Sequence, residues 1–280
     1  MKRIFCPKCD NQLSFDETKY PDGKILAFVC PQCGSQFKIK LGRKTVRTES
    51  GQEKEVKEPD FSCGHITVIE NTFGFKQELP LVMGDNMIGR RNKDTEGVDV
   101  PIITSDPSVG RKHCIINVKE DKQGNLWLAT YADGVYKKNV RTGGWEHFVH
   151  EEADSSTLPS NKVLSIFEDS QNQLWFTTQG GGFCRFVPSA NTFVRYDGIG
   201  LPSNVIYRIE EDEKGLFWVS TNKGLVHFNP KNSSFKVYTV ANGLLSNQFN
   251  YQSSYKDKNG RIYFGCINGF ISFAPSSFID

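Results

Sequence analysis

The chain has 280 residues, of which 38% are hydrophobic and 12% aromatic, and its formal net charge is +2. This near balance of charge argues against nucleic acid or a membrane surface as the dominant partner. Glycines and other turn residues are plentiful and no long helical periodicity is present, so we expect an all-β protein.

The N-terminal stretch MKRIFCPKCD begins with basic residues, but no apolar segment follows them. It therefore does not have the pattern of a secretory signal peptide. The purely apolar runs, such as residues 25–29, are far too short to span a bilayer, so we expect no membrane segment. From these features we expect a cytoplasmic protein.

Two C-x2-C pairs occur in the first 41 residues: Cys6 with Cys9, and Cys30 with Cys33. Each pair lies in a tight turn that contains proline, and the spacing is typical of a four-cysteine Zn²⁺ site. The alternative is a pair of disulfides or uncoordinated thiols. A segment of about 40 residues cannot build enough core alone, whereas structural zinc supplies roughly 10–16 kcal/mol. Residues 1–41 resemble a zinc ribbon held by this metal.

The remaining cysteines, Cys63, Cys114, Cys184 and Cys266, lack ligand spacing, and we expect them to be small buried side chains. Residues 42–60 have almost no apolar content and are predicted to form a flexible linker. Basic residues at its start could contact a phosphate backbone, but acidic residues follow at once. A solvated strand end is the preferred interpretation.

Short strand-like runs resume after the linker and include the motifs IGRR (88–91) and DPSVGRKHCII (106–116). Residues 61–119 resemble part of a forkhead-associated domain, a β-sandwich that binds phosphothreonine. The resemblance implies structural roles for Gly89 and His113 and a phosphate contact for Arg90. It places Arg111 and Lys112 on the neighbouring recognition loop, where a phosphoprotein or phosphopeptide would bind.

This chain departs from the forkhead-associated pattern in two ways. Gly110 stands where the family has a phosphate-binding serine, and Ser108 lies two residues too early to replace it. The family's second half, with its Asn-Gly loop that grips the peptide, is absent after Lys119. We therefore expect only weak phosphopeptide binding.

The remainder of the chain repeats with a period of 43–48 residues. Each repeat has an aromatic anchor, an aspartate six residues before it, and a Gly or Asn three residues before it. The anchors are Trp127, Trp175, Trp218 and Tyr263. A period near 40–45 residues with four short strands is typical of a propeller blade, in which such aromatics pack between blades.

The pattern D-x-x-G-x-L-W-x-x-T, followed by G-L-x-x-F and L-P-S-N, resembles the two-component-regulator propeller repeat. This repeat occurs in the sensory part of hybrid two-component sensors of Bacteroidetes, which detect glycan fragments outside the cytoplasm. The resemblance implies that residues 120–280 form three to four blades of an incomplete ring that binds an oligosaccharide.

The two resemblances meet near residues 117–123, which indicates a junction and favours a chimera over a natural two-domain protein. We expect the first blade to have lost its preceding segment there. An unclosed arc would also expose the terminal aromatics Trp127 and Tyr263. Such an arc would pair with a second copy or remain poorly ordered.

No Walker, Rossmann, H-E-x-x-H or G-x-S-x-G motif is present, so we expect no enzymatic activity. The preferred function is non-enzymatic binding and signalling by a ligand-sensing propeller segment. One alternative is a phosphothreonine-peptide adaptor with structural zinc. Another is a glycan-active enzyme that uses the propeller channel.

Overall fold

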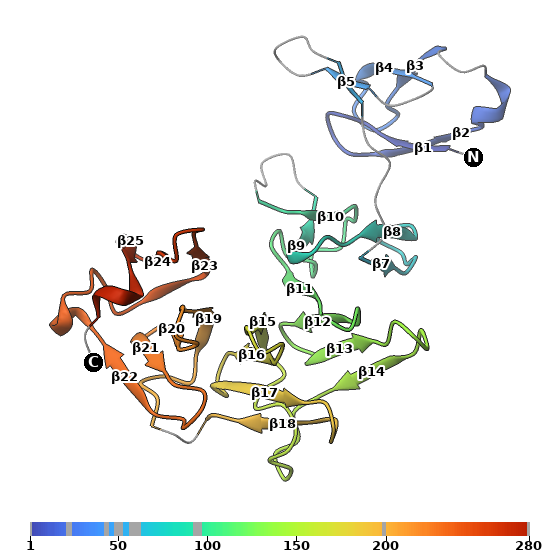
Figure 1. Cartoon of the computed structure of the whole chain (residues 1–280). Coiled ribbons are helices and arrows are strands. Elements are labelled where there is room, and N and C mark those ends of the chain that lie inside the picture. The colour runs from blue at the N-terminus through green and yellow to red at the C-terminus, as the bar shows by residue number, and fades with distance from the viewer. Residues whose placement is uncertain are drawn as a thin grey trace. The chain divides into compact units, whose positions relative to one another are not determined.

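The computed structural model confirms the all-β prediction (Figure 1). It describes residues 2–20, 24–41, 45–47, 53–55, 63–91, 97–197 and 200–278. Its two compact units are Met1–Pro59 and Asp60–Asp280. None of the described helices is long and apolar enough to cross a membrane.

The first unit consists of short antiparallel hairpins. Strand β1 (Lys2–Phe5) pairs with β2 (Gln12–Phe15), and β3 (Ile25–Val29) pairs with β4 (Gln36–Lys40). A 3-10 turn, η1 (Glu17–Lys19), follows β2. Each hairpin carries one cysteine pair in the turn between its strands, so the fold places the two pairs at equivalent positions.

The predicted linker, residues 42–60, lies largely outside the described residues. Within it the structure gives β5 (Thr45–Arg47), which pairs with β6 (Glu53–Glu55).

The second unit begins with the region that resembles a sandwich. Strand β7 (His65–Val68) pairs with β8 (Gln77–Pro80). Strand β9 (Gly84–Arg90) pairs in parallel with β10 (Val100–Ile102) and antiparallel with β11 (Cys114–Glu120). Strand β11 crosses the predicted boundary at residues 119–120.

Four successive blades follow and lie side by side in an arc (Figure 1). The first comprises β11, β12 (Leu126–Thr130), β13 (Val135–Lys138) and β14 (Trp145–Phe148). The second comprises β15 (Val163–Glu168), β16 (Leu174–Thr178), β17 (Phe183–Val187) and β18 (Thr192–Arg195). The third comprises β19 (Ile206–Glu211), β20 (Phe217–Thr221), β21 (Gly224–Phe228) and β22 (Phe235–Tyr238). The fourth comprises β23 (Phe249–Lys256), β24 (Ile262–Cys266) and β25 (Gly269–Phe273), with 3-10 turns η2 (Val240–Asn242) before it and η3 (Pro275–Ser277) after it.

The first blade is complete, which corrects the prediction that it lost its preceding segment. Strand β11 pairs with β12 on one edge and with β9 on the other, so the first blade belongs to a six-stranded sheet. It also contacts β15, the inner strand of the next blade. The strand of the sandwich-like region is therefore the inner strand of the propeller.

Aromatic side chains fill the space between successive blades. Trp127, Trp175 and Trp218 are each at most 1% exposed. The prediction that Trp127 lies exposed is wrong, because its ring packs against Phe176 and Phe186 of the following blade. Tyr263 has no following blade among the described residues and is only half-buried.

Backbone hydrogen bonds also join each blade to the next. The amides of Gly134, Gly182 and Gly224 donate to the carbonyls of Asn161, Asn204 and Asn247 at 3.0, 2.9 and 2.6 Å. These asparagines end the repeated L-P-S-N or L-L-S-N motif. The repeated motif thus positions each inner strand against the preceding blade.

Candidate functional site

A cavity of about 390 Å³ lies where residues from all four blades and from β9 converge. Its lining is Met87, Lys112, His113, Cys114, Ile115, Tyr131, Val163, Leu164, Tyr207, Tyr251 and Gln252. Mainly apolar walls with a few polar groups are typical of small-molecule sites.

Three tyrosines from different blades form the aromatic part of this cavity. The hydroxyls of Tyr131 and Tyr251 both donate to Gln179 Oε1, at 2.6 and 3.2 Å. The ring centroids of Tyr207 and Tyr251 lie 4.6 Å apart. Burial raises the pKa of Tyr207 and of Tyr251, so these phenols remain neutral hydrogen-bonding groups near pH 7.

A β-bulge positions the contribution of the fourth blade. The pairing of β23 with β24 shifts register between Phe249 and Ser254, and Gln252 has a φ of +51°. Bulges of this kind bend a strand and redirect its side chains. Here the bulged segment supplies both Tyr251 and Gln252 to the cavity.

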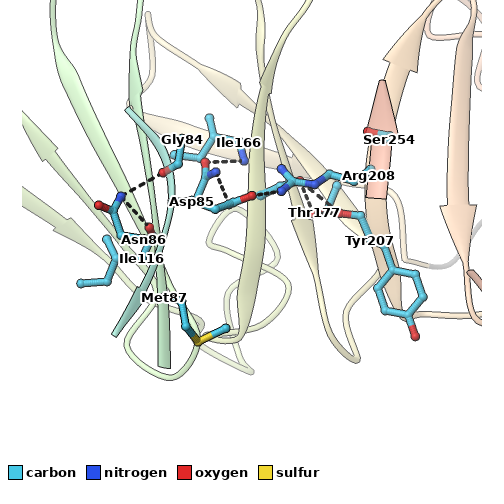
Figure 2. A network of polar contacts seen from close by, with 12 residues as sticks. Gly84, Asp85, Asn86, Met87, Ile116, Ile166, Thr177, Tyr207, Arg208 and Ser254 are labelled. Atoms are coloured by element: carbon cyan, nitrogen blue, oxygen red, sulfur yellow. Dashed lines mark hydrogen bonds and ion pairs between the residues drawn. The ribbon is translucent and has the colours of Figure 1, made fainter. Parts of the chain in front are cut away.

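A polar network joins β9 to the inner strands of the second and third blades (Figure 2). Asp85 forms an ion pair with Arg208 of β19. Asn117 Nδ2 donates to Asp85 Oδ1 at 2.6 Å, and Asn117 Oδ1 accepts from the amide of Ile166 at 3.2 Å. Figure 2 shows Met87 and Tyr207 on one side of this network, and both line the cavity.

The residues predicted from the forkhead-associated resemblance lie around one loop. A Cβ on Gly89 would meet the Arg111 carbonyl oxygen at 1.9 Å, so only glycine fits there. His113 Nδ1 accepts from the Gly110 amide at 3.2 Å and holds the loop. The guanidinium of Arg90 donates to the Asp106 carbonyl at 3.5 Å, and Arg111 is exposed.

Lys112 follows on the same loop and lines the central cavity instead of extending the Arg90 site. The structure thus places Arg90 beside the Asp106 carbonyl, Arg111 at the exposed surface and Lys112 at the central cavity.

The four N-terminal cysteines form a compact cluster in the first unit. All four sulfur atoms lie within 4.8 Å of one another. The Cys6 and Cys33 sulfurs are 3.6 Å apart, and those of Cys9 and Cys30 are 3.5 Å apart. These distances exceed the roughly 2 Å of a disulfide and approach the ~3.8 Å edge of a tetrahedron with Zn–S bonds of about 2.3 Å.

The two cysteine turns have matching backbones. The amides of Asp10 and Gly34 donate to the carbonyls of Cys6 and Cys30, both at 2.9 Å. Asp10 and Gly34 both have positive φ, which folds each turn back beneath its sulfurs.

The cysteine thiols of the cluster differ in pKa. Hydrogen bonds from the Ser35 side chain and backbone lower the pKa of Cys33 to about 6. A backbone hydrogen bond at Asn11 favours the thiolate of Cys9, but burial and the neighbouring sulfurs raise its pKa to about 12. Four thiolates this close need a cation among them to ionise together, so the donor set fits a divalent metal.

Sequence reasoning missed the tyrosines of the cavity and Gln179, which binds two of them. Tyr131 and Gln179 each lie four residues after an anchor tryptophan, in a column that continues with Asn222 and Ile267. The residue type at this position of the repeat differs from blade to blade, whereas nearby positions of the repeat keep similar residues. This variation was the available signal for a functional position.

Comparison with known proteins gives a family match to part of the propeller. Residues 157–180 and 200–223 match the model of the two-component regulator propeller. The curated protein Histidine kinase P4 of Formosa agariphila is 34% identical over 208 residues, which cover 56% of this chain and 15% of that protein. The chain thus spans a small part of this relative.

Solved structures with similar folds include sensors and a lyase. The extracellular domain of a hybrid two-component system from B. thetaiotaomicron is 18% identical, with a TM-score of 0.49 over 91% of this chain and 39% of that one. Virginiamycin B lyase from Staphylococcus aureus is 14% identical, with a TM-score of 0.43 over 57% of this chain and 55% of that one. The second and third blades contain the two segments that match the two-component regulator propeller repeat, residues 157–180 and 200–223.

Proposed function

We propose that this chain is a non-enzymatic sensing module whose propeller blades bind an oligosaccharide in the central cavity. The observation that carries this proposal is the convergence of Tyr131, Tyr207 and Tyr251 on one cavity. Tyrosine combines an apolar ring face with a polar hydroxyl. A sugar ring likewise has apolar C–H faces and a polar rim, so it can stack on a ring and bond to hydroxyl and amide groups.

The lining of the cavity favours binding over hydrolysis. Glycoside hydrolysis commonly uses a pair of carboxylates that flank the scissile bond. The lining residues among the described part of the chain include no aspartate or glutamate. The matched propeller repeats support the sensing role, and they favour a site outside the cytoplasm over the cytoplasmic placement expected from the N-terminal sequence.

Saccharide titration of matched tyrosine variants tests the proposal. Tyr251 and Tyr255 both lie on β23 and are 46% and 63% exposed, but only Tyr251 lines the cavity. After a glycan array identifies a bound oligosaccharide, Tyr251→Leu should weaken its binding about tenfold, the loss of roughly 1.5 kcal/mol of aromatic contact. Tyr255→Leu should leave binding unchanged. Equal losses in both variants, or no bound saccharide on the array, would contradict the proposal.

We also propose that Cys6, Cys9, Cys30 and Cys33 hold one structural Zn²⁺. When bound, the metal would supply the crosslink that two small hairpins cannot obtain from their own core. The sulfur separations and the matching turns support this assignment.

Metal analysis together with limited proteolysis tests the zinc site. Purified protein should contain one zinc per chain, and Cys9→Ser should release it and expose residues 2–41 to protease. Cys63→Ser is the control, because Cys63 lies outside the cluster and should leave both the zinc content and the cleavage pattern unchanged. Metal-free wild-type protein with an intact N-terminal unit would refute the assignment.

A further inference from the structure

The central cavity has an asymmetric charge. Its lining contains a lysine, Lys112, with His113 beside it, and no carboxylate from the residues that the structure describes. The remaining lining residues are apolar side chains, tyrosines and Gln252. A site lined by one sign of charge with apolar walls favours ligands of the opposite sign.

We propose that the saccharide bound in this cavity carries an acidic group, a carboxylate or a sulfate, which pairs with the ammonium of Lys112. This rests on the proposed function, and it makes Lys112 the residue that selects acidic over neutral sugars. Hydrogen bonds between ionised partners are about twice as strong as neutral ones.

The backbone around Lys112 is fixed although its side chain is exposed. The amide of the next residue, His113, donates to the Ile88 carbonyl at 2.8 Å, and His113 Nδ1 accepts from the Gly110 amide at 3.2 Å. The lysine therefore starts from a defined point at the cavity wall. Lys112 Nζ lies near Gly97, 3.5 Å from the position that a Cβ on this glycine would take. The side chain is exposed and flexible, so it can turn toward a ligand in the cavity, and keeping its charge near water carries little desolvation cost.

The apolar neighbours strengthen the pairing. Met87, Ile115 and Leu164 contribute apolar side chains to the lining of the cavity. A charge pair beside such walls has a lower effective dielectric constant than a pair in open solvent. The tyrosine hydroxyls and Gln252 would then hold the neutral part of the sugar while Lys112 contacts the acid.

Calorimetric titration of the full chain with matched disaccharides tests the proposal. The probes are cellobiose with cellobiouronic acid, galactobiose with digalacturonic acid, and cellobiose 6-sulfate. We expect at least one acidic sugar to bind about tenfold or more tightly than its neutral counterpart, the difference made by one hydrogen bond to a charged group. The uronic acids and the sulfate ester distinguish carboxylate from sulfate as the preferred acid.

Variants of Lys112 assign the effect to this residue. Lys112→Met should abolish the preference for the acidic sugar, and Lys112→Arg should retain most of it. Lys258→Met, at an exposed lysine outside the cavity, should bind like wild type. Equal binding of neutral and acidic sugars with no effect of Lys112→Met would overturn this inference and leave the proposed function intact. No binding of any probe, together with a negative glycan array, would refute both.

Discussion

The indole Nε1 of Trp175 donates to Oδ2 of Asp169 at 2.8 Å, across the turn that joins β15 to β16. The other oxygen of Asp169 accepts from the amides of Gln171 and Gln173 at 2.9 and 2.8 Å. Asp121 makes the equivalent contacts with Trp127 at 2.8 Å, and Asp212 with Trp218 at 3.3 Å. The repeated aspartate of each of these three blades therefore has two roles: one oxygen closes the turn and the other holds the buried tryptophan in place.

We expect Asp169→Ala to destabilise the propeller by about 3 kcal/mol, because it removes hydrogen bonds to a charged acceptor and leaves a buried indole N–H without a partner. Urea unfolding should show a lower midpoint with an unchanged slope. Asp257→Ala is the matched control, since its partner Tyr263 is only half-buried, and it should cost clearly less. Equal costs at both positions would contradict this account.

The acid sensitivity of the third blade should depend on Asp212. Burial opposes its charge, but the nearby His227, whose Nε2 lies 3.6 Å from Asp212 Oδ2, and hydrogen bonds from the amides of Leu216 and Lys214 and from Trp218 keep its pKa below the usual value. A carboxyl with a depressed folded-state pKa contributes stability above its unfolded pKa of about 4, and this contribution is lost as the pH falls through the folded value.

Asp212→Asn should therefore lower the free energy of unfolding at pH 7 and flatten its decline below pH 4. Urea titrations at pH 7, 4 and 3 measure both effects. Asp197→Asn, at an exposed aspartate, serves as the control and should keep the wild-type profile. An unchanged pH profile in Asp212→Asn would show that this carboxyl is not a source of the acid sensitivity.

The ion pair of Asp85 with Arg208 links β9 to the third blade. Its side chains are 25% and 17% exposed, so removing one partner leaves the other partly desolvated. We expect Arg208→Met to cost about 2 kcal/mol of unfolding free energy, between the values for surface and buried pairs.

A double-mutant cycle with Asp85→Asn measures the coupling of this pair. The control cycle uses Lys76 and Glu78, which pair at 2.9 Å with side chains 61% and 51% exposed. That cycle should give a coupling near zero. A coupling energy of zero for Asp85 and Arg208 as well would show that this ion pair does not stabilise the contact between β9 and the third blade.

The blades could be predicted from sequence because their signals are local. The aspartate turn and the anchor aromatic recur within six residues, so strands and core follow from turn chemistry and period. The inner-strand role of β11 was missed although Glu120-Asp121 matches Glu168-Asp169 and Glu211-Asp212. It was missed because the neighbouring motifs resemble a forkhead-associated domain, and this resemblance placed the strand in a sandwich instead of the propeller.

The cavity could not be predicted in the same way. Tyr131, Tyr207 and Tyr251 lie in different blades and meet only because the blades curve around a common centre. The bulge that redirects Tyr251 depends on a positive φ at Gln252. Glutamine rarely adopts a positive φ, so the sequence gives no reason to expect this conformation there. The cysteine cluster was predictable because each pair lies within one turn.

Phosphothreonine peptides should bind only weakly. Arg90 is directed to the Asp106 carbonyl, and Gly110 offers no hydroxyl to a phosphate. Loss of one such contact to a charged acceptor costs about 1.5–3 kcal/mol, or tenfold and more in affinity. Fluorescence anisotropy with a phosphothreonine peptide library should find no affinity tighter than the micromolar range. A tight complex that Arg90→Ala abolishes would contradict this prediction.

The last prediction concerns self-association through the fourth blade. A hollow of about 400 Å³ on its outer face is lined in part by Tyr255, Tyr263, Phe264 and Phe270. Phe270 is 67% exposed, although the equivalent faces of the other blades are covered by a following blade. An exposed aromatic face of this kind tends to be covered by a partner, and a second copy of this chain is the partner always present in solution.

We expect light scattering to show a dimer at tens of micromolar protein, and Phe270→Asp to shift it to monomer by placing a charge in the interface. Val140→Asp, which charges an apolar residue 57% exposed on the first blade, should leave the dimer intact. A wild-type chain that remains a cooperative, monodisperse monomer at these concentrations would show that the open face needs no second copy.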